Sequence, residues 1–371
     1  MQKMPLFFIL IFVSYILGNV YIFVRGLQTF GHLSLTFRIL YIVLYWLCAL
    51  LLFATFAIRN SQQIPFSLGQ VVFQIGAGWL VFILYMVIFL LCTDLIKLFN
   101  NSFSHGFVIS LFLTVSLLIY GFFNYKHLKK QVINISVNKP VTGVDKIKIV
   151  AVSDWHLGFG TDKTSLRKNV DIINAEKPDI ILIGGDLIDN SVVPVALQEM
   201  DKELNRLDAS MGIYMAPGNH EYISGLTECI NFLSKTKIQL LRDSAIILPC
   251  GLQIIGRDDY SNNNRLKAND WEKITDSSKP TIIIDHQPYN LSEAQQIGAD
   301  LQFSGHTHNG QIFPFNLLTS RLFEIGYGYE KREQTHFYVS SGFALWGPPF
   351  RIGTDSEVVV FEITFQPELL Q

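Results

Sequence analysis

The chain has 371 residues, of which 49% are hydrophobic and 16% are charged, and its formal net charge at pH 7 is -2. This charge balance, together with the lack of a long basic stripe interleaved with aromatic residues, argues against a nucleic-acid partner. The four cysteines show no C-x-x-C spacing, which argues against a disulfide framework or a thiolate metal site.

The excess of hydrophobic residues is concentrated before about residue 126, in four apolar stretches. A helix needs about 20 apolar residues, or as few as about 17, to cross a bilayer core of ~30 Å, and each stretch is long enough. Four stretches with almost no internal charge would require an implausibly large soluble core, so we predict membrane spans rather than buried core helices. The first lacks a small-x-small cleavage site, which predicts a retained helix. The predicted spans are residues 4–24, 37–58, 71–91 and 107–123.

Four spans place the N-terminus and the polar half of the chain on the same side of the membrane. Positive residues are in excess on that side, so the positive-inside rule predicts a multi-pass protein of the inner or cytoplasmic membrane with a cytoplasmic polar domain. The residues on the side of the polar domain are Lys3, Arg59, Lys126, Lys129 and Lys130, and those on the opposite side are Arg25, Arg38 and Lys97.

After Lys130 short β-branched runs alternate with helical segments, which is typical of an α/β domain. We therefore predict an all-α transmembrane region of four helices over residues 1–130, a junction over 131–145, and an α/β domain over 146–371. The junction is expected to open with a strand at 132–137. Strands are predicted at 148–153, 179–184, 212–216, 252–256, 281–285, 301–304, 337–340 and 357–364, and helices at 165–175, 194–207, 225–234 and 292–297.

Five short polar clusters each follow an apolar, β-branched run. The carboxyl ends of strands in an α/β sheet converge on a ligand crevice, so residues far apart in the sequence can meet there. The side chains are carboxylates, imidazoles and an amide, which hard or borderline metal ions accept. The clusters are Asp154-Trp155-His156, Gly185-Asp186-Leu187-Ile188-Asp189, Gly218-Asn219-His220-Glu221, Asp285-His286 and Gly305-His306-Thr307-His308.

Most of these clusters, taken alone, have an alternative explanation. Pairs such as Asp154 and His156 are frequent on protein surfaces, and Asp189 could cap a helix or bind nearby backbone. The Gly-Asn-His-Glu cluster also fits an exposed tight turn. Chance is a weaker explanation for the two imidazoles of His306 and His308.

As an ordered set, the clusters resemble the calcineurin-like metallophosphoesterase superfamily over about residues 146–365. The run Gly-His-Thr-His-Asn-Gly-Gln-Ile resembles its bacterial membrane-associated branch, although Asn309 stands where that branch often has glycine. The resemblance implies a four-layer sandwich of two mixed sheets flanked by helices. It also implies one metal bound by Asp154, His156, Asp186 and His308, and a second bound by Asp186, Asn219, His286 and His306.

The implied reaction is hydrolysis of a phosphoester or pyrophosphate bond by a hydroxide that bridges two divalent metals about 3.5–4 Å apart. A mixed shell of oxygen and nitrogen ligands suits manganese, iron or zinc better than magnesium alone. His220 is then expected to stabilise the phosphoryl group or to protonate the leaving oxygen, oriented by Asp189 or Glu221.

Residues 312–329 form an apolar insertion that could contact acyl chains, lie against a membrane, or fold onto its own domain. Together with the four spans it favours a lipid-linked phosphoester substrate, and the resemblance points to UDP-2,3-diacylglucosamine as a candidate. The main alternative is a catalytically inactive membrane sensor or scaffold, but every expected ligand and His220 are present. A transporter with a hydrolase appendage is disfavoured because the spans lack paired central charges.

Overall fold

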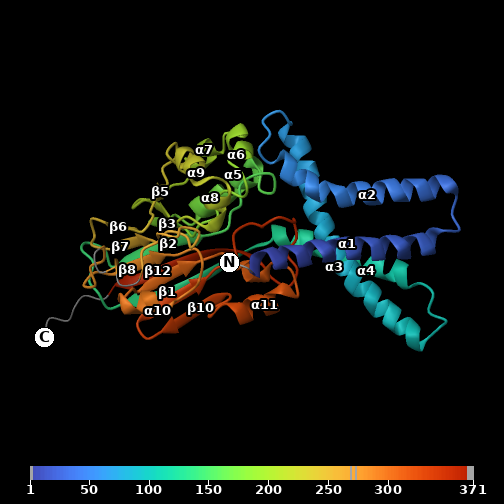
Figure 1. Cartoon of the computed structure of the whole chain (residues 1–371). Helices are drawn as coiled ribbons and strands as arrows, with labels where there is room; N and C mark the ends of the chain where they lie inside the picture. Colours follow the sequence, from blue (N-terminus) through green and yellow to red (C-terminus); the bar gives the residue numbers. More distant parts are fainter. Residues whose placement is uncertain (1–2, 268–269, 272–273, 366–371) are drawn as a thin grey trace. The chain divides into compact units, whose positions relative to one another are not determined.

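The computed structural model describes residues 3–267, 270–271 and 274–365. This part of the chain divides into two compact units. The first runs to Phe123 and includes Gly347–Phe350, whereas the second consists of Asn124–Trp346 and the chain from Arg351 onward. Figure 1 draws the long helices of the first unit in blue to cyan and most of the second in green to red.

The first unit contains the four predicted membrane helices. Each is long and apolar enough to cross a bilayer, which confirms the four apolar stretches as candidate spans. The third helix is the longest, at 34 residues, and extends beyond the predicted span at both ends. The helices are α1 (Lys3–Phe30), α2 (Leu35–Ile58), α3 (Phe66–Phe99) and α4 (Gly106–Lys126).

A buried polar group joins three of these helices. The indole nitrogen of Trp79 donates to the side-chain oxygen of Asn19 at 3.0 Å, and the hydroxyl of Tyr45 donates to the Asn19 carbonyl at 2.8 Å. Such interhelical hydrogen bonds stabilise packing where the bilayer supplies little hydrophobic driving force. Arg25 and Asp94 form an ion pair near the C-terminal ends of α1 and α3, away from the middle of either span.

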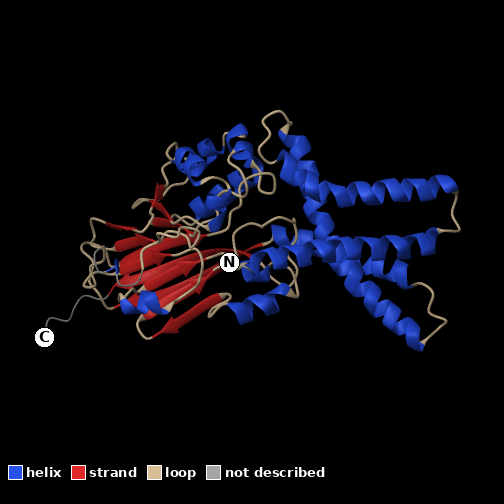
Figure 2. Ribbon diagram, in the orientation of Figure 1, coloured by secondary structure: helices blue, strands red, loops and turns tan. Residues whose placement is uncertain are grey.

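The second unit contains two six-stranded mixed sheets with helices beside them, as Figure 2 shows. The strand order is β1-β12-β2-β3-β4-β5 in one sheet and β10-β11-β9-β8-β7-β6 in the other. The first sheet contains β1 (Leu128–Val137), β2 (Lys146–Val152), β3 (Ile180–Ile183), β4 (Ile213–Met215), β5 (Gln239–Leu240) and β12 (Ser356–Phe365). The second contains β6 (Ser244–Ile247), β7 (Gln253–Gly256), β8 (Thr281–Ile284), β9 (Leu301–Ser304), β10 (Gly328–Arg332) and β11 (Thr335–Val339).

The helices of this unit are short except for the first. They are α5 (Lys163–Ala175), α6 (Val193–Leu197), α7 (Met200–Leu204), α8 (Asn219–Ile223), α9 (Leu226–Leu233), α10 (Ser292–Gln296), the 3₁₀ turn η2 (His308–Gly310) and α11 (Phe315–Leu322).

Three apolar cores separate the layers of the second unit. One lies between the first sheet and helices α5, α7 and α9, another between the two sheets, and the last beside the second sheet and α10. Strand β2 serves two of these cores, because Val150 and Val152 face the helices while Ile149 and Ala151 face the other sheet. A strand that is buried on both faces has a continuous apolar sequence. Because the four-layer architecture buries both faces of the central strands, it explains the apolar runs from which these strands were predicted.

Each of the eight strands predicted after residue 146 has a counterpart. Elements that were not predicted include β5, β6, β10, α8 and α11. Two predicted segments also differ from expectation. Residues 128–137 form β1, which pairs in parallel with β12, so the sheet begins before the expected junction does. The helix predicted over residues 194–207 is two short helices, α6 and α7, because Glu199 adopts a left-handed backbone conformation between them.

Candidate metal centre

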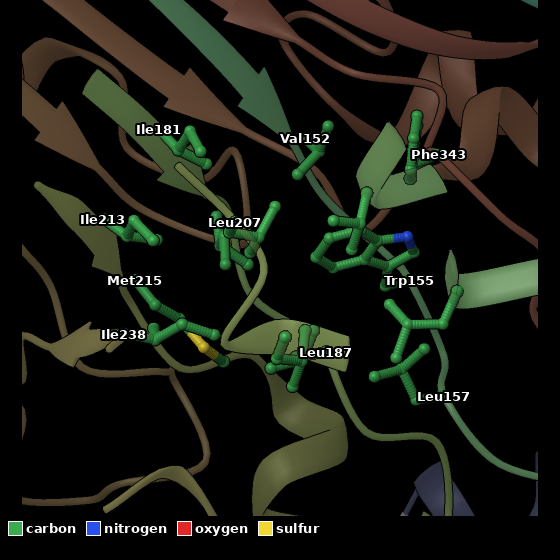
Figure 3. Close-up of a cluster of buried hydrophobic side chains, with 14 of the residues drawn as sticks. Val152, Trp155, Leu157, Ile181, Leu187, Leu207, Ile213, Met215, Ile238 and Phe343 are labelled. Atoms are coloured by element: carbon green, nitrogen blue, oxygen red, sulfur yellow. The ribbon is translucent and has the colours of Figure 1, made fainter. Parts of the chain in front are cut away.

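The seven predicted ligands follow the carboxyl ends of β2, β3, β4, β8 and β9. Five lie on loops, whereas Asn219 is the first residue of α8 and His308 the first of η2. The loops are held in place by apolar neighbours of the ligands. Trp155, next to Asp154, and Leu187, next to Asp186, are fully buried in the core between the first sheet and its helices (Figure 3). Because Trp155 and Leu187 point into the core, the polar residues next to them in the sequence point toward the opposite side of each loop.

Five of the seven residues have an unusual backbone conformation. Their φ angles are between 45° and 70°, in the left-handed region that residues other than glycine rarely occupy. Each such residue costs on the order of 1–3 kcal/mol, and such strain concentrates at functional sites. The five are Asp154, His156, Asp186, His306 and His308.

Two glycines are required because the carboxylates approach the backbone closely. A Cβ atom on Gly305 would lie 2.3 Å from a carboxylate oxygen of Asp154, and one on Gly218 would lie 2.2 Å from a carboxylate oxygen of Asp186. Both distances are far inside van der Waals contact, so these positions accept only glycine.

The first group of converging side chains consists of Asp154, His156 and His308. The Nε2 atoms of the two imidazoles are 3.1 Å apart, and Nε2 of His308 is 3.3 Å from a carboxylate oxygen of Asp154. A carboxylate oxygen of Asp186 lies 3.8 Å from Nε2 of His156, so Asp186 borders this group.

The second group consists of Asp186, His286 and His306. The same carboxylate oxygen of Asp186 lies 3.1 Å from Nε2 of His286. The side-chain oxygen of Asn219 completes the group, at 3.2 Å from Nε2 of His286 and 3.0 Å from Nδ1 of His306. Asp186 therefore stands between the two groups, and the structure brings all seven predicted ligands together.

The chemistry of these atoms fits bound cations. Carboxylate and amide oxygens oriented in this way are acceptors, and two facing imidazole nitrogens at 3.1 Å can share at most one proton between them. Burial, with a smaller contribution from His286, lowers the pKa of His306 to about 4, so its neutral ring offers a lone pair. Burial likewise holds the pKa of His308 well below its usual value. The site thus has more acceptor atoms than protons, which one or more metal ions can satisfy.

The carboxyl of Asp186 is the negative centre of the cluster. Burial alone would raise its pKa, but the neighbouring imidazoles of His286 and His220 outweigh burial and hold that pKa well below its ordinary value. Asp186 is therefore ionised at neutral pH, as a shared metal ligand must be.

His220 and Asp189 lie at the edge of the cluster and contact it. His220 converges with His156 and Asp186 in a third group. Nδ1 of His156 also lies 3.3 Å from the Asp189 carboxylate. The Nδ1 atom of His220 donates to the Asp189 carbonyl at 2.5 Å and lies 3.3 Å from its carboxylate. Burial lowers the pKa of His220, but Asp186 and Asp189 outweigh it and raise that pKa to about 9. In its protonated form the ring can contact a phosphoryl group or donate a proton.

Glu221 was expected from the sequence as a possible partner of the His220 ring, but its carboxylate binds backbone groups instead. Its carboxylate accepts the backbone N–H groups of Asp186 at 3.0 Å, Ile188 at 3.1 Å and Gly218 at 2.7 Å. It therefore fixes the backbone of two ligand loops, whereas Asp189 is the acidic residue whose carboxylate faces the ring of His220.

Arg351 was not identified as a site residue from the sequence. Its side chain is fully buried and donates to four backbone carbonyls, those of Ser341, Gly342, Ala344 and His308. Residues 342–353 are otherwise apolar or glycine and proline, and a charged residue among them is the sequence signal that could have indicated a buried structural arginine.

The sequence is similar to known phosphoesterases. Residues 147–310 match the family model of the calcineurin-like phosphoesterases. An uncharacterized metallophosphoesterase of Campylobacter jejuni is 34% identical over 278 residues, with 72% of each chain covered. Another, of Aquifex aeolicus, is 32% identical, and the match covers 68% of this chain and 98% of that protein. A Danio rerio transmembrane protein with metallophosphoesterase domain is 31% identical, and this chain covers 61% of its length.

Proposed function

The chain belongs to the calcineurin-like phosphoesterase family, and from this premise we propose that it is a membrane-anchored, metal-dependent hydrolase of a phosphoester or pyrophosphate bond. The observation that carries the proposal is the position of Asp186, whose carboxylate oxygen lies 3.1 Å from His286 and 3.8 Å from His156, in two different ligand groups. One carboxylate between two sets of imidazoles suits a pair of ions better than a single ion.

We assign the ligands to two divalent ions. The first would be held by Asp154, His156, Asp186 and His308, and the second by Asp186, Asn219, His286 and His306. This mixture of oxygen and nitrogen atoms suits manganese, iron or zinc. When bound, a pair of such ions supplies an activated water nucleophile at neutral pH and neutralises charge on the phosphoryl oxygens.

His220 is the residue of this chain that we assign to the leaving group or the phosphoryl oxygens. Its ring stands at a centroid distance of 4.6 Å from that of His156, adjacent to the ligand groups. The Asp189 carbonyl holds Nδ1, which leaves Nε2 as the nitrogen free to face a substrate. A protonated imidazole there can donate a proton as the bond to the leaving oxygen breaks.

The proposed substrate is a lipid-linked phosphoester, for which UDP-2,3-diacylglucosamine is the compound to test first. Support comes from the four candidate spans and from the exposed apolar side chains on and around α11, which directly follows the turn that bears His308. Turnover of the acylated sugar nucleotide should exceed that of its deacylated analogue. Equal turnover of the two compounds would argue against a site that recognises lipid.

We further propose that the catalytic unit is cytoplasmic, because positive residues flank the spans mainly on its side. Fusing a reporter that is active only in the cytoplasm to the C-terminus tests this orientation. An active reporter is expected, and activity only of a periplasmic reporter at the same position would reverse the assignment.

The hydrolase proposal is tested with the full chain purified in detergent, using an aryl phosphomonoester and an aryl phosphodiester. Hydrolysis of at least one compound should stop on chelation and return when manganese or zinc is restored. A protein that binds two ions but hydrolyses neither these compounds nor a pyrophosphate would instead fit the membrane sensor or scaffold.

A further inference from the structure

Helix α11 presents its apolar side chains outward. None of its eight residues is buried, and Phe315, Leu317, Leu318 and Leu322 are each between 46% and 62% exposed. A surface helix of a soluble domain normally turns such residues toward its own core.

Two polar residues of α11, rather than its apolar ones, are turned toward its own domain. Asn316 and Thr319 are only partly exposed, and the side-chain oxygen of Asn316 is buried. A Cβ atom on Gly326 would lie 3.2 Å from the backbone of Thr319, which shows that this side of the helix packs against the following loop. The helix thus packs on its own domain through Asn316 and Thr319 and exposes its apolar side chains together with Ser320 and Arg321.

Further exposed apolar side chains flank the helix. Phe313 is 48% exposed just before it, and Trp346 is 55% exposed on a neighbouring loop. Trp346 is tethered to the same segment, because its backbone N–H and carbonyl both hydrogen-bond to the side chain of Gln311 at 3.0 Å. We refer to Phe313, Phe315, Leu317, Leu318, Leu322 and Trp346 as the apolar rim.

Hydrogen bonds connect the start of the rim to the end of a candidate span. Asn124, in the last turn of α4, donates to the carbonyls of Arg351 at 3.2 Å and Thr354 at 2.9 Å. Between these two residues, Ile352 accepts the N–H of Phe313 at 2.8 Å and donates to the carbonyl of Gln311 at 3.2 Å. The first residue of the rim is therefore one short loop away from the last turn of α4.

The length of α4 locates that turn relative to a bilayer. Its 21 residues extend about 31 Å at 1.5 Å per residue, close to the ~30 Å thickness of the hydrocarbon core. If α4 spans the bilayer, Asn124 lies at the boundary between hydrocarbon and headgroups. The hydrogen bonds through Arg351, Ile352 and Thr354 join Phe313, just before α11, to Asn124 within the second unit.

We propose that the apolar rim is a membrane-contact surface whose occupant is the lipid bilayer at the end of α4. An amphipathic helix at such a surface lies in the plane of the interface with its apolar side about 5–10 Å into the boundary of headgroups and acyl chains. Trp346 fits the same environment, because tryptophan is enriched at membrane interfaces. This proposal concerns lipid contact alone and does not depend on the proposed hydrolysis.

Contact of the rim with lipid would hold the ligand turn close to the membrane surface. Turn η2, which carries His308, packs directly on α11, since a Cβ atom on Gly310 would lie 2.2 Å from the backbone nitrogen of Asn316. The turn and the helix therefore pack closely against each other.

Photocrosslinking of the full chain tests the proposal. A benzophenone amino acid replaces Leu318, and the protein is placed in nanodiscs of phosphatidylethanolamine and phosphatidylglycerol that contain an alkyne-tagged phospholipid. Two matched positions serve as references: Leu40 in α2, which is 53% exposed on a candidate span, and Ile247 at the end of β6, which is 50% exposed. Unfolding temperatures of the three labelled proteins check that each retains its fold.

The rim position should give a tagged-lipid adduct, as Leu40 does, while Ile247 should give none. A lipid adduct at Leu318 no stronger than that at Ile247 would overturn the proposal. Adducts at Leu318 to a second copy of the chain in place of lipid would also overturn it, and would assign the rim to self-association.

Discussion

The guanidinium of Arg351 donates a hydrogen bond of 3.0 Å to the backbone carbonyl of His308, one of the proposed metal ligands. The same guanidinium donates to the carbonyl of Ala344 at 2.9 Å and to that of Ser341 at 2.5 Å. One buried cation thus joins the ligand turn to the loop after β11. Burial lowers the pKa of Arg351 to about 10, despite the nearby carboxylates of Glu357 and Asp154, and the group remains charged at neutral pH.

Replacing this arginine by an apolar residue should loosen the ligand turn. In Arg351→Met the carbonyls it serves lose their donor, and each unsatisfied buried group costs about 1–3 kcal/mol. Because the carbonyl of His308 is among them, metal affinity should fall by about 10–100-fold. Metal titration and thermal unfolding measure the two effects. Lys168→Met, at an exposed lysine on helix α5, which carries no proposed ligand, is the control, and unchanged metal affinity in Arg351→Met would refute the positioning role.

Glu221 should behave as a support for the ligand loops. In Glu221→Gln an amide replaces a carboxylate that accepts three backbone N–H groups, including that of Asp186. We expect lower unfolding free energy, by about 1–3 kcal/mol for each donor left unpaired, and metal affinity reduced by about 10–100-fold. Denaturant unfolding and metal analysis check this. The exposed Glu228→Gln should change neither quantity, and a Glu221→Gln protein that matches it would contradict the assignment.

His220 should affect turnover more than metal binding. Loss of a positioned proton donor in His220→Ala should lower kcat by about 10²–10⁴-fold while both metals remain bound. Elemental analysis and steady-state kinetics separate these quantities. His336→Ala supplies a comparison, because His336 is buried and hydrogen-bonded to Tyr329 rather than to the cluster. Loss of one metal in His220→Ala would show instead that His220 is a ligand.

Glu203 should make stability depend on pH. Hydrogen bonds from Arg167, opposed by burial and reinforced by Arg206, lower the pKa of Glu203 to about 2. A lowered pKa contributes stability above the ordinary value of 4.5, and this contribution is lost as the pH falls from there toward 2. The arginines are largely exposed, so the contribution is at most about 1 kcal/mol.

The measurement compares unfolding free energies of the wild type and Glu203→Gln at neutral pH and near pH 3. The difference between the two proteins should shrink at the lower pH. Glu228→Gln, where the carboxyl is exposed, should show no such trend. A difference for Glu203→Gln that is the same at both pH values would show that packing, not charge, accounts for it.

Much of the fold could be predicted because burial imposes a repeating pattern on the sequence. The runs that form β2, β3 and β8 are apolar on both faces, and the four long apolar stretches admit few alternatives to membrane helices. The seven proposed ligands, which the structure brings together, could also be selected from the sequence, since each follows such a run and offers a metal-binding atom.

What the sequence did not reveal depends on contacts with backbone atoms. Glu221 accepts backbone N–H groups of another loop, and Arg351 donates to backbone carbonyls of another loop. Backbone groups are the same in every residue, so such contacts cannot be predicted from the residue pattern. The outward-facing leucines of α11 have the periodicity of an ordinary helix, so only the structure shows which way they point. The break between α6 and α7 rests on one left-handed residue, Glu199, whose type does not favour that conformation.

The central claim is that Asp186 is shared by two metal ions that the chain uses to hydrolyse a phosphoester. The most direct test measures metal content and turnover of an aryl phosphodiester, a phosphomonoester and a pyrophosphate in Asp186→Asn, beside Asp208→Asn at an exposed aspartate. We predict that Asp186→Asn loses bound metal and all hydrolysis, while Asp208→Asn retains both. Unchanged metal content and turnover in Asp186→Asn would contradict the account.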